Sequence, residues 1–173
     1  MTTTYYYVNA FDNARPDWIK YGASPYLGTI DYPANYIFTG GGADGTLIEE
    51  TGNYDFQNSG SENAEVIDSV AVEFYKKDCL NNPASVRVYV WNGSAWVDVG
   101  VLALSNNVWG WISIDVSSVI DSWSKVDGCR VYLKGTSSRA TQCTGIDCAR
   151  LNVVSHAAAA ALLLRKQVGI GLG

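Results

Sequence analysis

Residues 85–99 contain the pattern that most constrains the fold of this chain. Residues 85–91 alternate polar and apolar side chains, so their three valines share one face of a strand. The dipeptide Asn92-Gly93 follows, and it favours a tight hairpin because both central residues of a type I′ turn need positive φ. Residues 95–99 then alternate again as a returning strand. The sequence therefore predicts an antiparallel β-hairpin here.

Comparable strand patterns recur through a chain whose 173 residues suit one domain. Further strands are predicted at 36–39, 46–49, 70–75, 109–115, 129–134 and 147–154. One short internal helix is expected at 116–123, where Val119, Ile120 and Trp123 share a face. Many short strands with Gly and Asn turns indicate an all-β fold, and we predict an antiparallel jelly-roll-like β-sandwich over residues 1–154.

The C-terminal residues 155–173 have a different composition. Ser155 is a helix-capping residue, and the alanines and leucines after it favour a helix over 156–167. This helix would be apolar on every side and far shorter than the ~20 residues of a membrane span. In residues 168–173 apolar side chains then alternate with glycines, as in a strand with one apolar face. The sequence predicts a helix-plus-strand tail.

This tail suggests self-assembly, since an apolar segment needs a surface to cover it. The other interpretation is a terminus folded back on its own domain. The N-terminal tyrosines either pack on a neighbouring subunit or form the first strand of the domain. The expected interface residues are Ala157, Ala161, Leu162, Leu163, Leu164, Val168, Ile170 and Leu172, together with Tyr5, Tyr6 and Tyr7.

Charge is distributed unevenly along the chain, whose formal net charge is −5. Between Lys20 and Lys76 there are nine acidic residues and no basic ones, whereas basic residues dominate after Lys125. Acidic and basic faces would align neighbouring subunits, unless the acidic residues are simply solvated. Nucleic acid is not an expected partner, because its binding depends on Lys and Arg. No apolar run is long enough to span a membrane.

Cysteines and acidic residues give two further expectations. Cys79, Cys129, Cys143 and Cys148 allow disulfides, the alternative being free thiols that pack as small apolar groups. Asp12, Asp17 and Asp147 would form a calcium site if the termini meet. No other cofactor is expected.

The first eight residues lack the basic and apolar regions of a signal peptide. Either a signal peptide has been removed, or the protein is released in another way, such as virion assembly. In both cases we expect the chain on a virion or an extracellular surface.

Tryptophans supply candidate sugar contacts, because sugars stack on exposed aromatic faces. The candidates are Trp91, Trp96, Trp109 and Trp111. Trp109 and Trp111 share one face of a strand, and Trp91 and Trp96 flank the expected turn. The alternatives are core packing and a plain cross-strand pair.

No enzyme is predicted, and no catalytic residues are assigned. A glycoside hydrolase needs two carboxylates facing each other across a cleft. Glu49 and Glu50 are adjacent and would point to opposite faces. Glu73 would point inward, either as a candidate carboxylate or as a buried structural residue. The single histidine, His156, accompanies no hydrolase motif.

Several segments resemble jelly-roll domains related to carbohydrate-binding modules, over about residues 5–154. They are Trp18, Gly22, Pro25, Tyr26, Leu27, Asp31, Tyr36 and Ile37, then residues 86–96, 111–120 and 146–151. Similar sandwiches occur in sugar-binding modules, in virion decoration and fibre proteins, and in extracellular filaments. The resemblance implies a fold and leaves several functions open.

These observations favour a structural, self-assembling protein of a virion capsid, decoration or tail, or of an extracellular filament. Its expected partners are further copies of itself, other virion or surface proteins, and glycans. The alternative is a carbohydrate-binding module, and a glycoside hydrolase is the least favoured reading.

Overall fold

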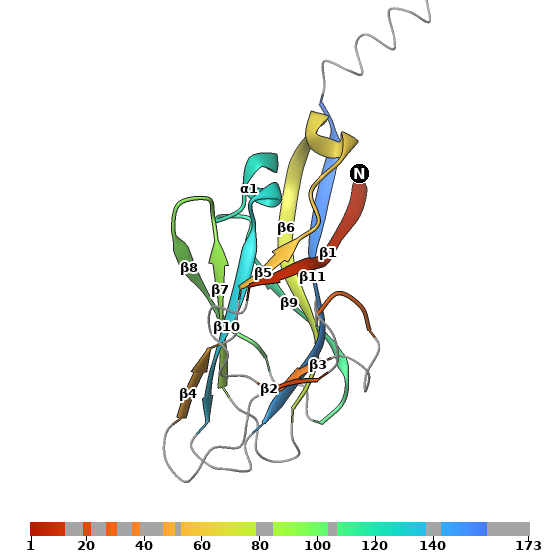
Figure 1. The fold of residues 1–173 in the computed structure, drawn as a ribbon. Helices are drawn as coiled ribbons and strands as arrows, with labels where there is room; N and C mark the ends of the chain where they lie inside the picture. The colour runs from red at the N-terminus through yellow and green to blue at the C-terminus, as the bar shows by residue number, and fades with distance from the viewer. Residues whose placement is uncertain are drawn as a thin grey trace, which may run out of the picture.

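The fold is seen in a computed structural model that describes residues 1–12, 19–21, 27–30, 36–38, 47–50, 53–78, 85–103, 107–137 and 143–158. The strands are β1 (Thr2–Asp12), β2 (Ile19–Tyr21), β3 (Tyr36–Phe38), β4 (Leu47–Glu50), β5 (Asn53–Phe56), β6 (Glu65–Asp78), β7 (Ser85–Trp91), β8 (Trp96–Val101), β9 (Gly110–Asp115), β10 (Arg130–Ser137) and β11 (Thr144–Ala157). A 3-10 turn, η1 (Ser61–Ala64), and a short helix, α1 (Trp123–Asp127), complete these elements (Figure 1).

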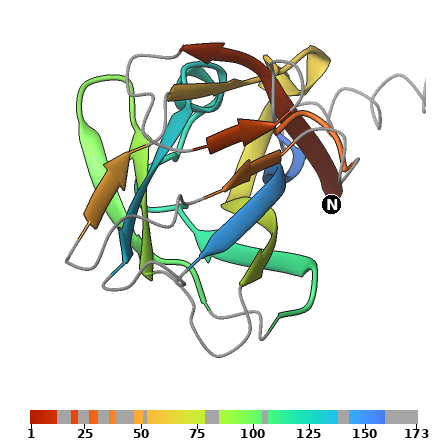
Figure 2. The ribbon, with the colours of Figure 1, turned by 60° about the horizontal axis from the view of Figure 1, so that its bottom comes forward.

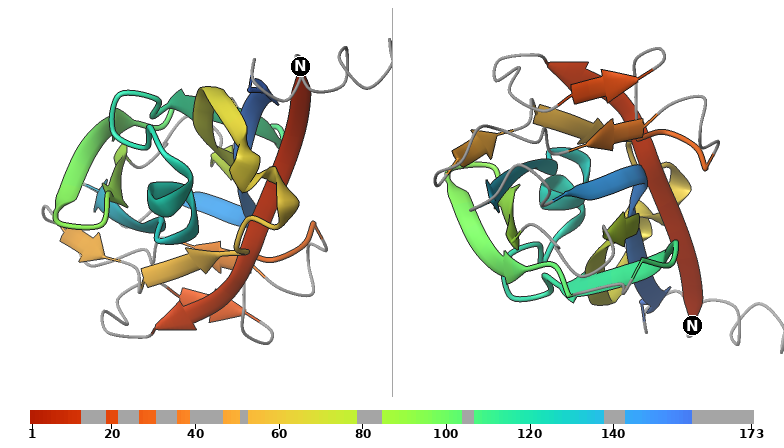
Figure 3. Two further views of the ribbon diagram at one scale, coloured as in Figure 1. Left: turned by 90° about the horizontal axis from the view of Figure 1, so that it is seen from above. Right: turned by 90° about the horizontal axis from the view of Figure 1, so that it is seen from below.

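Two antiparallel layers are joined by the long strand β1. Its residues from Thr2 to Tyr7 pair with β11, and its residues from Val8 to Asp12 pair with β5. The first sheet contains β9, β6 and β11, with β1 and the β2–β3 pair on the far side of β11. The second sheet runs from β1 through β5, β10 and β7 to β8, with β4 also on β10. Seen along the long axis, β1 crosses one side of the molecule (Figure 3). The antiparallel β-sandwich predicted from the sequence is confirmed.

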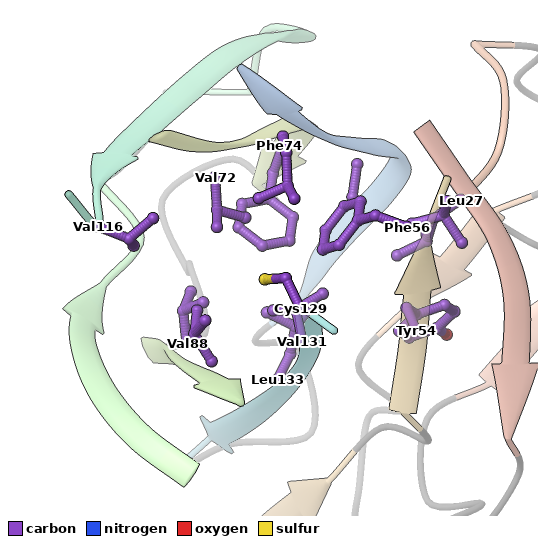
Figure 4. Close-up of a cluster of buried hydrophobic side chains, with 14 of the residues drawn as sticks. Leu27, Tyr54, Phe56, Val72, Phe74, Val88, Val116, Cys129, Val131 and Leu133 are labelled. Carbon is purple, nitrogen blue, oxygen red and sulfur yellow. The ribbon is translucent and has the colours of Figure 1, made fainter. Parts of the chain in front are cut away.

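The hydrophobic core lies between the two layers. Val72 and Phe74 of β6 face Val88 of β7 and Val131 of β10, and all four are fully buried (Figure 4). Alternation along the strands places these side chains inward, as the sequence predicts for β7. The opposite faces of β6 and β7 are therefore free to carry polar and aromatic side chains.

The core also holds an ion pair at the end of β6 that pairs with β11 where β3 does. The β2–β3 pair comes forward in Figure 2. Lys76 and Asp78 follow Phe74 on the inward face of β6, at 1% and 2% exposure. The Lys76 ammonium donates to both carboxylate oxygens of Asp78, at 2.7 and 2.9 Å. The Thr144 hydroxyl donates a third hydrogen bond to Asp78, at 2.7 Å. These bonds compensate for the loss of hydration that burial imposes on the two charges.

The predicted hairpin is confirmed, but its turn is longer than a type I′ turn. Trp91 pairs with Trp96, so four residues form the loop, and only Gly93 among them has positive φ (97°). The Asn92 side-chain oxygen accepts hydrogen bonds from the N–H groups of Ser94 and Ala95. This side chain replaces the backbone geometry that a two-residue turn would need.

One short internal helix is present, but its predicted position at 116–123 is wrong. Ile120 N–H bonds to Val116 C=O, which makes a single helical turn before the chain turns away. Ser117 donates from its N–H and hydroxyl to the Asp115 carboxylate, which lowers the pKa of Asp115. Such side-chain bonds compete with helix continuation. The helix α1 begins only at Trp123, whose indole N–H bonds to Glu65 C=O at 2.6 Å.

Strand β11 passes the expected end of the sandwich at residue 154. Ser155, His156 and Ala157 were expected to begin a helix, but they pair with the N-terminal end of β6. His156 Nδ1 lies 2.8 Å from Asp68 Oδ1, and Ser155 Oγ bonds to Glu65. Pairing with a strand that extends as far as Glu65 outweighs the helix preference of alanine. The remainder of the predicted helix and strand, residues 159–173, lies outside the described residues.

Candidate functional site

A continuous row of side chains crosses the outer face of the second sheet. Trp96 of β8 pairs with Trp91 of β7, which pairs with Arg130 of β10. Arg130 pairs with Asp55 of β5, which pairs with Ala10 of β1. Directly opposed residues point to the same side of a sheet, so the five side chains form one line. We call this line the cross-strand row.

Next to the cross-strand row, the tyrosines of β7 and β10 complete a group of four aromatic rings. Tyr89 and Tyr132 are stacked with centroids 4.6 Å apart and planes only 1° apart. The Trp96 ring meets the Tyr132 ring edge-on, with centroids 4.8 Å apart. The Trp91 ring is tilted against Trp96, with centroids 5.6 Å apart. We call these four residues the aromatic platform. Trp91, Trp96 and Tyr89 stay partly exposed, so mutual contacts hold the rings without burying them.

Two ion pairs lie at the edges of this platform. Arg87 donates to the Asp98 carboxylate at 2.5 Å, and Arg130 Nε lies 2.9 Å from Asp55 Oδ1. All four charged side chains are at least one-third exposed. Exposed pairs of this kind add little to stability, but they present fixed donors and acceptors beside the rings. The face therefore combines stacking surfaces with polar groups of both kinds.

A pocket of about 290 Å³ opens at the Ala10 end of the cross-strand row. Its lining consists of Asn9, Ala10, Asp55, Phe56, Asn58, Asp127, Gly128, Cys129 and Arg130. The Asp127 carboxylate is held in place by Ser59, whose N–H and hydroxyl both donate to Oδ1 at 2.6 Å. Asp55 and Arg130 belong to the row and to the pocket, so the two features are continuous.

The outer face of the first sheet is built differently, around Arg150 of β11. Its guanidinium carbon lies 3.9 Å from the ring centroids of both Tyr5 and Trp111. Arg150 also donates to Glu73 at 2.7 Å and to the Tyr7 hydroxyl at 3.2 Å. Burial disfavours the charged form, but these hydrogen bonds outweigh it and raise the pKa of Arg150 above its usual value. This guanidinium covers one face of Trp111.

The structure therefore separates the four tryptophans expected to contact sugar. Trp91 and Trp96 lie together on the second sheet as the expected cross-strand pair. Trp109 and Trp111 are on the first sheet, where Trp109 stacks on Tyr75 at 5.6 Å. The Trp91 and Trp96 pair lies beside the two Arg–Asp pairs and is continuous with the pocket, whereas the Arg150 guanidinium covers Trp111.

The structure also places the N-terminal tyrosines and Glu73. Tyr6 is 4% exposed and belongs to the core, so the N-terminal tyrosines form the first strand of the domain. Burial, with smaller effects from nearby carboxylates, raises the pKa of Tyr6 to about 12. Glu73 lies on the outer face of its strand and not inward, and it accepts hydrogen bonds from Arg150 and Asn152. Apart from Ala157, the expected interface residues of the tail lie outside the described residues.

Part of the charge asymmetry is paired within the chain. Asp55, Glu73 and Asp68 come from the acidic segment, and they contact Arg130, Arg150 and His156 respectively. These contacts join strands that are distant in the sequence. They reduce the charge available to align neighbouring subunits.

Cys143 is disulfide-bonded, and Cys129 and Cys148 are buried thiols, whereas Cys79 lies outside the described residues. Of the proposed calcium ligands, Asp147 is fully buried, and the side chains of Asp12 and Asp17 are not described. Within the described ranges, no group of three or more His, Cys, Asp or Glu side chains is placed to hold a metal ion. No helix in that part of the chain is both long and apolar enough to cross a membrane.

Sequence reasoning missed Tyr89, Tyr132, Arg130 and the pocket residues as site components. Alternation placed Tyr89 on the outer face, but the pairing of β10 with both β7 and β5 was not visible in the sequence. That pairing is what joins Arg130 to Trp91 and Asp55.

No protein-family description and no curated protein sequence matches the chain. The solved structures that this chain resembles include the following three. A family 61 carbohydrate-binding module in complex with β-1,4-galactotriose is 10% identical, covering 85% of this chain and 88% of its own, with a TM-score of 0.45. A family 35 carbohydrate-binding module from an environmental isolate is 12% identical, and the match covers 90% of this chain and 98% of that module, with a TM-score of 0.39. The C-terminal extracellular domain of Mycobacterium tuberculosis EmbC is 10% identical, and the match covers 88% of this chain and 56% of that one, with a TM-score of 0.43.

Proposed function

We propose that this chain is a non-catalytic glycan-binding domain, and that the glycan binds on the outer face of the second sheet. The observation that carries the proposal is the aromatic platform, which meets two exposed Arg–Asp pairs on one face. Sugar rings have apolar faces that stack on aromatic side chains and hydroxyls that need both donors and acceptors. Trp91 and Trp96 would supply the stacking surfaces.

Preorganisation supports this assignment. The rings are fixed by one another, and the hairpin that carries Trp91 and Trp96 is closed by the Asn92 side chain. Little conformational entropy is lost when a ligand meets side chains that are already ordered. The disulfide at Cys143 fits a chain that works in an oxidising, extracellular setting.

The experiment is affinity electrophoresis through gels that contain galactan, xylan, glucomannan, polygalacturonate or alginate. Retardation by at least one polysaccharide is expected, and it should be lost in Trp91→Ala and Trp96→Ala. Trp109→Ala is the matched control, since it removes a tryptophan from the outer face of the other sheet. Retention of the wild-type chain by none of these polysaccharides would refute the proposal. Loss of retention only in Trp109→Ala would move the site to the first sheet.

Self-assembly through the C-terminal residues, the function that the sequence favours, is the second candidate here, and it depends on residues outside the described ranges. Light scattering of the whole chain and of a chain ending at Ala158 tests it, because β11 ends at Ala157. Particles formed by the whole chain and lost on truncation would support assembly. Identical monomers would exclude the tail as an assembly element.

A further inference from the structure

We infer that the pocket at the Ala10 end of the cross-strand row binds one uncharged sugar residue of a glycan that lies across the strands of the second sheet. This inference rests on the proposed function, because the aromatic platform is the part of the site that first engages the glycan. It adds a direction for the glycan, a terminal subsite and a preference for neutral sugars.

The direction follows from the strand register. Trp96, Trp91, Arg130, Asp55 and Ala10 are successive cross-strand partners. Neighbouring strands lie about 4.8 Å apart, so the four steps span roughly 19 Å of the face. A glycan stacked on Trp91 and extended along the row therefore passes Arg130 and reaches the pocket.

The pocket has the chemistry to bind hydroxyl groups. Asn9 sits in the β-bulge between Val8 and Ala10, and Asn58 follows the end of β5. Each amide offers both a donor and an acceptor. Asp127 adds a carboxylate that the two Ser59 hydrogen bonds hold in one orientation. Phe56 and Cys129 are nearly buried and provide an apolar base for the C–H face of a sugar.

The charges of the pocket favour an uncharged ligand. Asp55 and Asp127 face one guanidinium, that of Arg130, so the lining carries more negative than positive charge. The guanidinium is already paired with Asp55. A uronic acid would bring its carboxylate next to Asp127, and like charges at short range weaken binding.

The test measures calorimetric affinity for neutral xylo-, cello- and β-1,4-galacto-oligosaccharides of two, four and six residues. Two variants probe the pocket. Ala10→Phe fills it, and Asn58→Ala removes an amide, while both leave the aromatic platform unchanged. Ala157→Phe is the control for the first variant, since Ala157 is an exposed alanine at the end of β11. If Ala10→Phe fails to fold, Asn58→Ala still decides the question.

For the wild-type chain and Ala157→Phe, we expect affinity to rise about tenfold or more between two and six residues, as added hydrogen bonds imply. In the pocket variants the two-residue affinity should persist and this rise should disappear. Oligogalacturonides of six residues should bind more weakly than the neutral series. The inference is overturned if the pocket variants keep the wild-type length dependence, or if the acidic series binds more tightly. Failure of every oligosaccharide to bind a wild-type chain that a polysaccharide gel still retards would overturn the inference and leave the proposed function standing. Failure in both assays would refute the proposed function itself.

Discussion

Arg130 of β10 lies directly opposite Trp91 of β7, and its guanidinium Nε is 2.9 Å from the Asp55 carboxylate on the next strand. This one side chain connects the aromatic half of the outer face to its polar half. Arg130 and Asp55 are 53% and 38% exposed, so their pairing contributes little to stability. Under the proposed function, Arg130 is a donor to the bound glycan, and its replacement is a direct test of that role.

Replacing Arg130 with glutamine should weaken glycan binding and leave stability nearly unchanged. We expect about tenfold lower affinity for a six-residue glycan, since the charged donor is lost. The free energy of unfolding should change by less than about 1 kcal/mol. Calorimetry and urea denaturation measure the two quantities. Lys125→Gln is the control, because it removes a cation from an exposed pair with Asp121 on another part of the chain. A stability loss above about 2 kcal/mol would assign Arg130 a structural role instead.

Replacing Lys76 with methionine should destabilise the sandwich strongly. The change leaves the Asp78 carboxylate in the core without its cation, and breaking a buried pair costs about 3–5 kcal/mol. Urea denaturation should show this loss in the free energy of unfolding. The double variant Lys76→Met with Asp78→Leu removes both charges and should recover much of it. Equal stability of the single and double variants would contradict this account of the ion pair.

Arg150→Ala should destabilise the first sheet without affecting glycan binding. The guanidinium lies between Tyr5 and Trp111 and bonds to Glu73, which is 12% exposed. Loss of both stacking contacts and of the ion pair should lower the free energy of unfolding by about 3 kcal/mol. Arg150→Lys keeps the charge but not the planar contacts, so its free energy of unfolding should lie between those of the wild-type chain and Arg150→Ala. Lost glycan affinity in a folded Arg150→Lys variant would place the ligand on the first sheet.

Stability should fall as the pH rises above about 9. Burial raises the pKa of the Cys129 thiol to about 12 from 9.0, so the unfolded chain releases this proton at lower pH than the folded chain. Between these values the unfolded state binds fewer protons, and the free energy of unfolding decreases with pH by up to about 1.4 kcal/mol per unit. Urea denaturation from pH 8 to pH 10.5 measures the slope. Cys129→Ala should show a smaller slope, and an unchanged slope would contradict burial of the thiol.

Local patterns in the sequence were sufficient to predict the β7–β8 hairpin. Its two strands are four residues apart, and the alternation that buries Val86, Val88 and Val90 is complete within one strand. The Trp91–Trp96 pair follows directly from that hairpin. A cross-strand contact between adjacent strands needs no knowledge of the rest of the fold.

Long-range pairing was not predictable in the same way. β1 pairs with β11, more than 140 residues away, and β10 lies between β5 and β7. No spacing along the chain specifies that Arg130 will join Trp91 to Asp55. The helix predicted at 116–123 was misplaced for a related reason. The Ser117 hydroxyl donates locally to Asp115 and accepts from the N–H of Val70 on another strand, and these bonds override helical periodicity.

The central claim is that a glycan binds on the outer face of the second sheet. Its most direct test is to follow the tryptophan indole N–H signals by NMR while adding a glycan that retards the chain in affinity electrophoresis. The chain has six tryptophans, and each indole signal is assigned by replacing one tryptophan at a time. Glycan binding on the second sheet predicts saturable shifts of the Trp91 and Trp96 signals, with Trp109 and Trp111 unchanged. Shifts confined to Trp109 and Trp111 would contradict the proposed site.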